Sequence, residues 1–391
     1  MSKHIYPLLV AQFLSAFADN AILFAVIAMV MQAASPPSWY VPALQSVFLV
    51  AFVLLAPWVG SFADNHAKSR VLIIANLIKA TGAGLLLLKV EPLIAYCIVG
   101  VGAALYSPAK YGILPELAGH GSLVKANSWI EGSTILAILT GMVVGAKVAD
   151  YSISWALLGT VVLFLISAAT TLFLPVKISR KEPSGSKILL FWREVRDFLS
   201  LPRSRFAVLG ASLFWAAAAC VRVIIVAWAP LILMTHNASD IANLTLFLAL
   251  GIIAGSAVVP RLIPLEHLRR ARIPAYLMAL LIMGLSLTDA AWSARVVLFL
   301  MGTAGGMFIV PINAALQELG QQSIGSGGAV AMQNFFQNSA MLLSVGAYTL
   351  AASQQVGPIA ALLALGGLLL LATFLVVLHL PEATPPASSP E

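Results

Sequence analysis

Long apolar runs fill almost the whole chain, and only short polar segments separate them. A run of about 20 apolar residues is enough for one α-helix to cross a bilayer. The pattern predicts an all-α polytopic membrane protein with about twelve spanning helices. The helices are expected at residues 6–31, 42–63, 70–88, 93–113, 126–149, 155–176, 206–234, 240–260, 272–289, 294–316, 327–353 and 357–380.

One long polar connection divides these runs into two sets of six. Within it, "KILLFWREVRDFLSLP" places Leu189, Trp192 and Val195 at helical spacing with charged residues between them. This pattern predicts an amphipathic helix at the membrane interface. We therefore predict a first half at 1–176, a linker at 177–205, a second half at 206–380 and a disordered tail at 381–391.

Composition and charge support a membrane protein and indicate its orientation. The chain is 60% hydrophobic and 9% charged, whereas soluble domains carry roughly 25% charged residues. With a cytoplasmic N-terminus, sixteen lysines and arginines fall on the cytoplasmic side and three on the other. Because basic residues favour the cytoplasmic side, both termini are predicted to be cytoplasmic.

The two halves share a repeated sequence pattern. "YSPAKYGILPEL" at 106–117 parallels "IVPINAALQEL" at 309–319, and "ANSWIEGST" at 126–134 parallels "AMQNFFQNSA" at 331–340. These repeats align Lys110 with Asn313, and Glu131 with Gln337. Parallel six-helix repeats with a substrate site between them are typical of the major facilitator architecture.

A loop motif adds to this resemblance. "VGSFADNHAKSR" at 59–70 is similar to the signature between the second and third helices of that superfamily, although Ala67 replaces the usual glycine. The matching residues are expected to act in gating, and they are Gly60, Asp64, Lys68 and Arg70.

Charged side chains also lie inside the predicted spans. A charge at the centre of a membrane helix costs about 2.5–3.5 kcal/mol, so these residues should face a cavity or a partner. Gln12, Ser15 and Asp19 share one helix face. The other intramembrane charges are Lys110, Glu131 and Arg222.

Two structural explanations compete with a functional one for these charges. Asp19 with Arg222, or Glu131 with Lys110, could be ion pairs that only hold helices together. Lys79 is expected to reach the cytoplasmic interface with its long side chain, and so to have no part in the site.

The sequence offers little support for catalysis. No histidines or cysteines have the spacing of a metal site, and no GxxxxGK[ST] motif is present. We expect no enzymatic activity, no metal, no cofactor and no nucleic-acid partner.

Several blocks together resemble the bacterial lysophospholipid transporters of the major facilitator superfamily. They are "VAQFLSAFADNAILFA" at 10–25, "VGVGAALYSPAKYGILPEL" at 99–117, "LVKANSWIEGSTI" at 123–135, "SLFWAAAACVRVIIVAW" at 212–228 and "VPINAALQE" at 310–318. The resemblance implies transport of 2-acyl-glycerophosphoethanolamine from the outer to the inner leaflet of the bacterial inner membrane by facilitated diffusion. A separate cytoplasmic acyltransferase–acyl-carrier-protein synthetase would then re-acylate it.

This substrate suits the chemistry of the intramembrane residues. Arg222 can donate two hydrogen bonds to a phosphate, and Lys110 can attract it as a point charge. Asp19 or Glu131 can accept from the ammonium group. The expected substrate-binding residues are Gln12, Asp19, Asn20, Lys110, Glu131, Arg222, Asn313 and Gln337.

Two other functions remain open on the sequence. One is a proton-coupled exporter of drugs or small amphiphiles, with Asp19 or Glu131 as the proton carrier. The other is a membrane scaffold that recruits cytoplasmic enzymes through residues 177–205.

Overall fold

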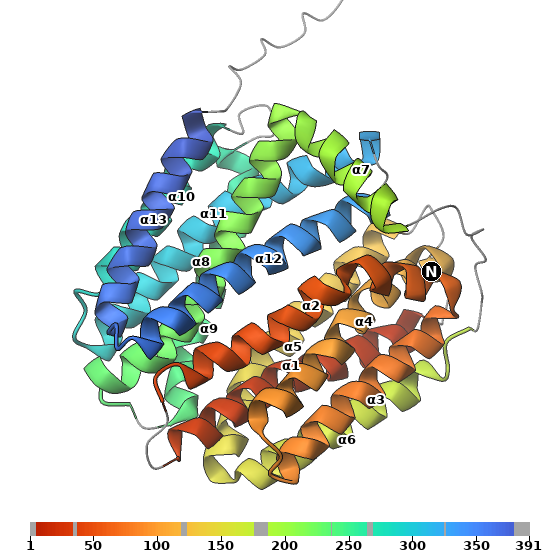
Figure 1. Ribbon diagram of the computed structural model, residues 1–391, viewed down its shortest axis with the longest axis horizontal. Coiled ribbons are helices and arrows are strands. Elements are labelled where there is room, and N and C mark those ends of the chain that lie inside the picture. The colour runs from red at the N-terminus through yellow and green to blue at the C-terminus, as the bar shows by residue number, and fades with distance from the viewer. Residues whose placement is uncertain are drawn as a thin grey trace, which may run out of the picture.

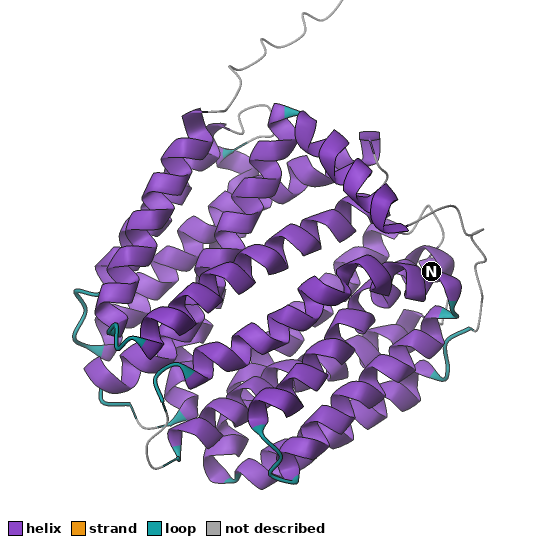
Figure 2. Ribbon diagram, in the orientation of Figure 1, coloured by secondary structure: helices purple, strands orange, loops and turns teal. Residues whose placement is uncertain are grey.

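The computed structural model describes residues 5–33, 37–118, 123–175, 187–235, 237–263, 269–323 and 326–378. Within these ranges the chain is built from α-helices and contains no strand (Figure 2). The helices are α1 (Ile5–Met31), α2 (Tyr40–Asn65), α3 (Lys68–Leu87), α4 (Pro92–Ala118), α5 (Leu123–Tyr151), α6 (Ile153–Thr171), α7 (Lys187–Ser200), α8 (Pro202–Ile232), α9 (Ala238–Leu262), α10 (Arg272–Leu285), α11 (Ala291–Ser323), α12 (Ser326–Ser353) and α13 (Pro358–Leu378).

The predicted fold class is confirmed, because each predicted span overlaps one of these helices. Ten helices in the described ranges are long and apolar enough to cross a membrane. Two predicted spans do not meet that criterion. Helix α10 is only 14 residues long, and α12 carries amides at Gln333, Asn334, Gln337 and Asn338.

Two groups of helices pack side by side (Figure 1). In the first, α1 packs against α5 and α6, and α3 packs against α4 and α6. In the second, α8 packs against α12, and α10 packs against α11 and α13. Helices α2 and α12 run next to each other where the groups meet, as Figure 1 shows. We call the two groups the N-half (α1–α6) and the C-half (α8–α13).

Glycines let α9 and α11 approach each other closely. A GxxxG pattern occurs on both helices, at Gly251 and Gly255 and at Gly302 and Gly306. A Cβ added at any of these four positions would collide with a backbone carbonyl oxygen of the other helix. Such small-residue faces drive helix association in membranes, so this contact is a backbone-to-backbone seam.

Hydrogen bonds join the halves at the end of the bundle that holds the α1–α2 connection. The Asp150 carboxylate of α5 accepts from the backbone N–H groups of Ala238 (2.8 Å) and Ser239 (2.9 Å), at the start of α9. Nearby, Ser38 Oγ donates to the Ala352 carbonyl at 2.7 Å. A carboxylate at a helix N-terminus is favourable, because it satisfies free N–H groups and complements the helix dipole.

The predicted amphipathic helix of the linker is present as α7. Val195 and Phe198 are buried, whereas Leu189 and Trp192 are exposed. The Trp192 ring meets Phe335 of α12 edge to face, with centroids 5.8 Å apart. Thus α7 packs against α8 and α2 through its buried face, contacts α12 through Trp192, and leaves Leu189 exposed. The predicted tail at 381–391 lies outside the described residues.

Candidate functional site

The Asp19 carboxylate forms an ion pair with Lys79. Lys79 Nζ lies 2.7 Å from Asp19 Oδ2 and also donates to Ser15 Oγ at 2.9 Å. Asp19 thus has Lys79 as its ion-pair partner in this structure, rather than Arg222, which was one of the alternatives left open by the sequence. The expectation that Lys79 reaches the interface is wrong, since this side chain is only 1% exposed. Its position on α3 directs it inward, against α1.

Aromatic rings enclose the lysine. The Lys79 ammonium lies 4.6 Å from the Tyr106 ring centroid and 5.4 Å from that of Phe164. Both distances are within the range of cation–π attraction, which stabilises a cation removed from water. The ring faces and the carboxylate together compensate for the burial of this charge.

A chain of hydrogen bonds extends from this ion pair through the N-half. Ser15 Oγ donates to Asn76 Oδ1 at 2.9 Å, and Asn76 Nδ2 donates to Ser167 Oγ at 2.9 Å. Ser167 Oγ then donates to the Ala11 carbonyl at 2.7 Å. These fully paired polar groups link α1, α3 and α6, so they hold Asp19 and Lys79 in a fixed geometry.

The second oxygen of Asp19 remains available. Among the residues described, Asp19 Oδ1 is buried and has no hydrogen-bond partner. Lys110 of α4 is buried and lies within electrostatic range of the same carboxylate, with its ammonium 4.1 Å from the Tyr111 ring centroid. Asp19 can therefore accept one further hydrogen bond without giving up Lys79.

Gln12 and Asn20 differ in which of their side-chain hydrogen-bonding groups are already paired. Gln12 Nε2 donates to Thr134 Oγ1 of α5 at 2.8 Å, while its Oε1 is buried and unpaired within the described part of the chain. Asn20 Nδ2 donates to the Ala16 carbonyl of its own helix at 2.9 Å. Gln12 thus shares with Asp19 both a helix face and an unused acceptor, whereas the Asn20 donor is satisfied locally.

Arg222 brings the opposite charge from the C-half. It lies in α8, and its Nε atom is buried with no partner among the described residues. Tyr96 of α4 lies within electrostatic range of both Asp19 and Arg222. Since Asp19 and Lys79 balance each other, Arg222 carries the unbalanced charge of these three groups. A buried guanidinium of this kind suits an anion with several acceptor oxygens.

The predicted amides of the C-half lie on α11 and α12. Asn313 Oδ1 accepts from Gln333 Nε2 at 2.8 Å, so these two helices are bonded to each other. Gln337 is buried, and its Nε2 is unpaired in the part of the chain that the structure describes. Gln337 therefore adds a free donor in the C-half to the free acceptors in the N-half.

Three predicted residues lie outside the part of the structure whose exposure and contacts are described, and they are Gly60, Asp64 and Glu131. Lys68 is buried at the start of α3, and Arg70 is exposed. The predictions for gating and for Glu131 therefore stand as predictions.

The sequence did not identify Lys79 and Asn76 as parts of the site. A signal was present, because the two residues are three positions apart and so share a face of α3. The depth of Lys79 in its predicted span, taken alone, suggested that its side chain reaches the membrane interface. The polar Asn76 on the same helix face was the better indication, because it predicts that this face of α3 points into the protein.

Comparison with known proteins identifies the family. The sequence pattern of the Major Facilitator Superfamily matches residues 8–345. The chain is 41% identical to the lysophospholipid transporter LplT of Photorhabdus laumondii, over 90% of this chain and 89% of that protein. It is 42% identical to the protein of the same name from Salmonella paratyphi B, over 90% and 88% of the two chains.

Solved structures agree on the fold. The nucleoside transporter NupG superposes with a TM-score of 0.73 at 14% identity, over 96% of this chain and 99% of that chain. A POT family transporter in complex with 5-aminolevulinic acid superposes with a TM-score of 0.77 at 12% identity, over 98% and 97%. These identities support the architecture alone. The family match over residues 8–345 and the two relatives at 41% and 42% identity show that the chain belongs to the major facilitator superfamily and, within it, to the family of the lysophospholipid transporters LplT.

Proposed function

We propose that this protein transports lysophospholipids, chiefly 2-acyl-glycerophosphoethanolamine, from the outer to the inner leaflet of the bacterial inner membrane. The observation that carries this proposal is a pair of unused hydrogen-bonding groups of opposite charge, one in each half of the molecule. Within the described part of the chain, Asp19 keeps one free oxygen beside its ion pair, and Arg222 keeps a free N–H. An ethanolamine phosphate headgroup has one ammonium and one phosphate to match them.

The two charges would bind different parts of the headgroup. Arg222 donates to the phosphate, where charge-assisted hydrogen bonds are strongest. Asp19 accepts from the ammonium through Oδ1, while Lys79 holds Oδ2. Gln12 and Gln337 supply a further acceptor and donor for the glycerol hydroxyl. Because Lys79 already neutralises Asp19, binding needs no proton on the carboxylate, which favours facilitated diffusion.

Movement would follow from rocking of the N-half against the C-half. With both termini cytoplasmic, the bonds of Asp150 to α9 lie on the outer side of the membrane. They would hold that side closed while the headgroup leaves toward the cytoplasm. A separate acyltransferase–acyl-carrier-protein synthetase would then re-acylate the lipid.

Reconstitution tests the proposal. The purified protein in liposomes should move labelled lysophosphatidylethanolamine inward faster than empty liposomes do, with or without an ion gradient. Asp19→Ala and Arg222→Ala should each abolish most of this movement. Arg196→Gln on α7 is the matched control, since this side chain is 81% exposed and distant from the site in sequence. Unimpaired movement in both site variants would refute the proposal.

The same vesicles test proton-coupled export. Uptake or release of a cationic dye that depends on a proton gradient, without movement of the lysolipid, would favour the exporter over the lipid transporter. Transport by the purified chain alone would argue against a role limited to recruiting other enzymes.

A further inference from the structure

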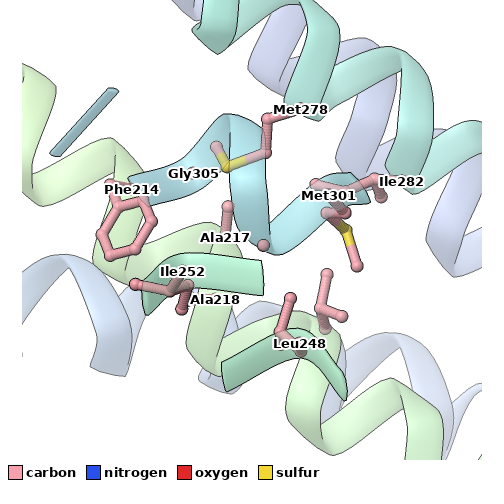
Figure 3. Close-up of a pocket in the computed structure, with 11 residues that line it drawn as sticks. Phe214, Ala217, Ala218, Leu248, Ile252, Met278, Ile282, Met301 and Gly305 are labelled. Atoms are coloured by element: carbon pink, nitrogen blue, oxygen red, sulfur yellow. The ribbon is translucent and has the colours of Figure 1, made fainter. Parts of the chain in front are cut away.

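A partly open apolar pocket lies inside the C-half (Figure 3). Helices α8, α9, α10 and α11 all contribute to its wall, and every lining residue is apolar. It contains about 270 Å³ of atom-free space, part of which is open to the surroundings. Its lining includes Phe214, Ala218, Val221, Met278, Met301 and Gly305.

The pocket is next to Arg222 along α8. Val221 lines the pocket and directly precedes Arg222, and Ala218 lies one helical turn before it. Residues four apart in a helix share a face, so Ala218 and Arg222 point to neighbouring regions. A ligand with an anion at Arg222 would therefore have an apolar wall about one turn away.

Gly305 lies at the wall of the pocket, close to two flexible side chains. A Cβ at this position would lie 2.8 Å from Phe214 Cε2 and 3.4 Å from Met278 Sδ. Both atoms are at the ends of side chains, and methionine is unbranched and adaptable, so Met278 and Met301 can move to admit a guest. Apolar cavities of this kind stay dry and bind apolar groups.

We infer that this pocket receives part of the acyl chain of the transported lipid while the phosphate is bound at Arg222. The inference rests on the proposed function and adds a second, apolar contact to it. The space suits a segment of a chain rather than a whole one, so the rest of the chain remains in the bilayer. Only a chain long enough to reach the pocket gains this contact, which makes the pocket a determinant of chain-length preference.

Pocket-filling variants test the inference. Ala218→Leu and Gly305→Ala place carbon atoms in the space, and the variants are compared with wild type in proteoliposomes. The two substrates are lysophosphatidylethanolamines with a short lauroyl or a long oleoyl chain. Wild type should prefer the oleoyl lipid. Filling should lower the ratio of oleoyl to lauroyl transport toward one, with little change in lauroyl transport.

Matched controls separate pocket filling from general disturbance. Ala364→Leu adds the same atoms at an exposed position of α13, and Gly284→Ala adds a methyl where nothing lies within 4 Å. Both should retain the wild-type preference. Equal transport loss for both lipids, or no change, in the pocket variants would overturn the inference. If wild type moved neither lipid, the proposed function itself would fail.

A labelling experiment on the wild-type protein tests the inference even if the pocket-filling variants do not fold. A lysolipid with a diazirine near the end of its oleoyl chain is irradiated with the wild-type protein, and the labelled peptides are identified. Labels on peptides that contain Met278 or Met301 are expected. Labels confined to other helices would overturn the inference.

Discussion

At the scale of single residues, the central feature is a carboxylate that is already paired and still has an acceptor to offer. Lys79 is paired with one carboxylate oxygen of Asp19. The hydrogen-bonded side chains of Ser15, Asn76 and Ser167 hold this ion pair in place. Pairing makes the buried charge tolerable in the membrane. The free oxygen is what remains for a ligand.

This arrangement predicts unequal effects of removing one charge or both. Lys79→Met leaves the Asp19 carboxylate buried without its counter-charge, which costs about 3–5 kcal/mol in buried pairs. The double variant Asp19→Asn/Lys79→Met removes both charges and should recover most of that loss. Thermal unfolding in detergent measures the difference. A double variant no more stable than Lys79→Met would show that the pair is not the source of the effect.

At the scale of helices, close packing of α9 on α11 fixes the wall of the C-half. The glycines of this seam leave no room for a side chain. The same two helices line the acyl-chain pocket that we propose, so the seam also sets the shape of that pocket.

A methyl group in this seam should be costly. In Gly302→Ala the new Cβ would collide with the Leu248 carbonyl, which is backbone and cannot turn away. Overpacking of this kind costs about 1–3 kcal/mol, and the melting temperature in detergent should fall accordingly. Gly346→Ala on α12 is the control, since nothing lies within 4 Å of that position, and its melting temperature should stay close to that of wild type. Equal melting temperatures for the two variants would contradict the account.

The positions of the helices along the chain were easier to predict from the sequence than the contacts between helices. Apolar run length alone locates the spans, because a bilayer demands about 20 apolar residues from each helix. The rotation of one helix against another depends on side chains from both, and one sequence does not reveal it. For this reason the sequence singled out Asp19 and Arg222 by their depth, but it placed Lys79 at the interface instead of against Asp19. The apolar pocket was not foreseen either, since its lining residues resemble any others in a membrane helix.

At the scale of the whole molecule, the halves are joined by hydrogen bonds at one end. Asp150 supplies two of them by capping a helix that belongs to the other half. An ordinary cap stabilises its own helix, whereas this one stabilises one arrangement of the two halves.

Removal of this cap should open that end of the bundle. Loss of an N-cap costs about 0.5–2 kcal/mol, so Asp150→Ala should raise the open population roughly twofold to thirtyfold. Thr349 of α12 lies between the halves, since its Oγ1 is 3.4 Å from Ser46 Oγ of α2. A cysteine placed at Thr349, in a protein lacking Cys97 and Cys220, reports opening by its rate of reaction with a maleimide. Asp289→Ala, in the exposed loop between α10 and α11, is the control. Equal labelling rates in the two variants would show that the Asp150 hydrogen bonds to α9 do not hold this end of the bundle closed.

The most direct test of the account is headgroup selectivity in proteoliposomes. Lysophosphatidylethanolamine has a phosphate and an ammonium, whereas lysophosphatidylglycerol has the phosphate without the ammonium. Arg222→Gln should slow both lipids by roughly tenfold or more, because hydrogen bonds to charged groups contribute about 1.5–3 kcal/mol. The double variant Asp19→Asn/Lys79→Met should lose chiefly the movement of lysophosphatidylethanolamine. Movement of both lipids at the wild-type rate by Arg222→Gln would contradict the central claim.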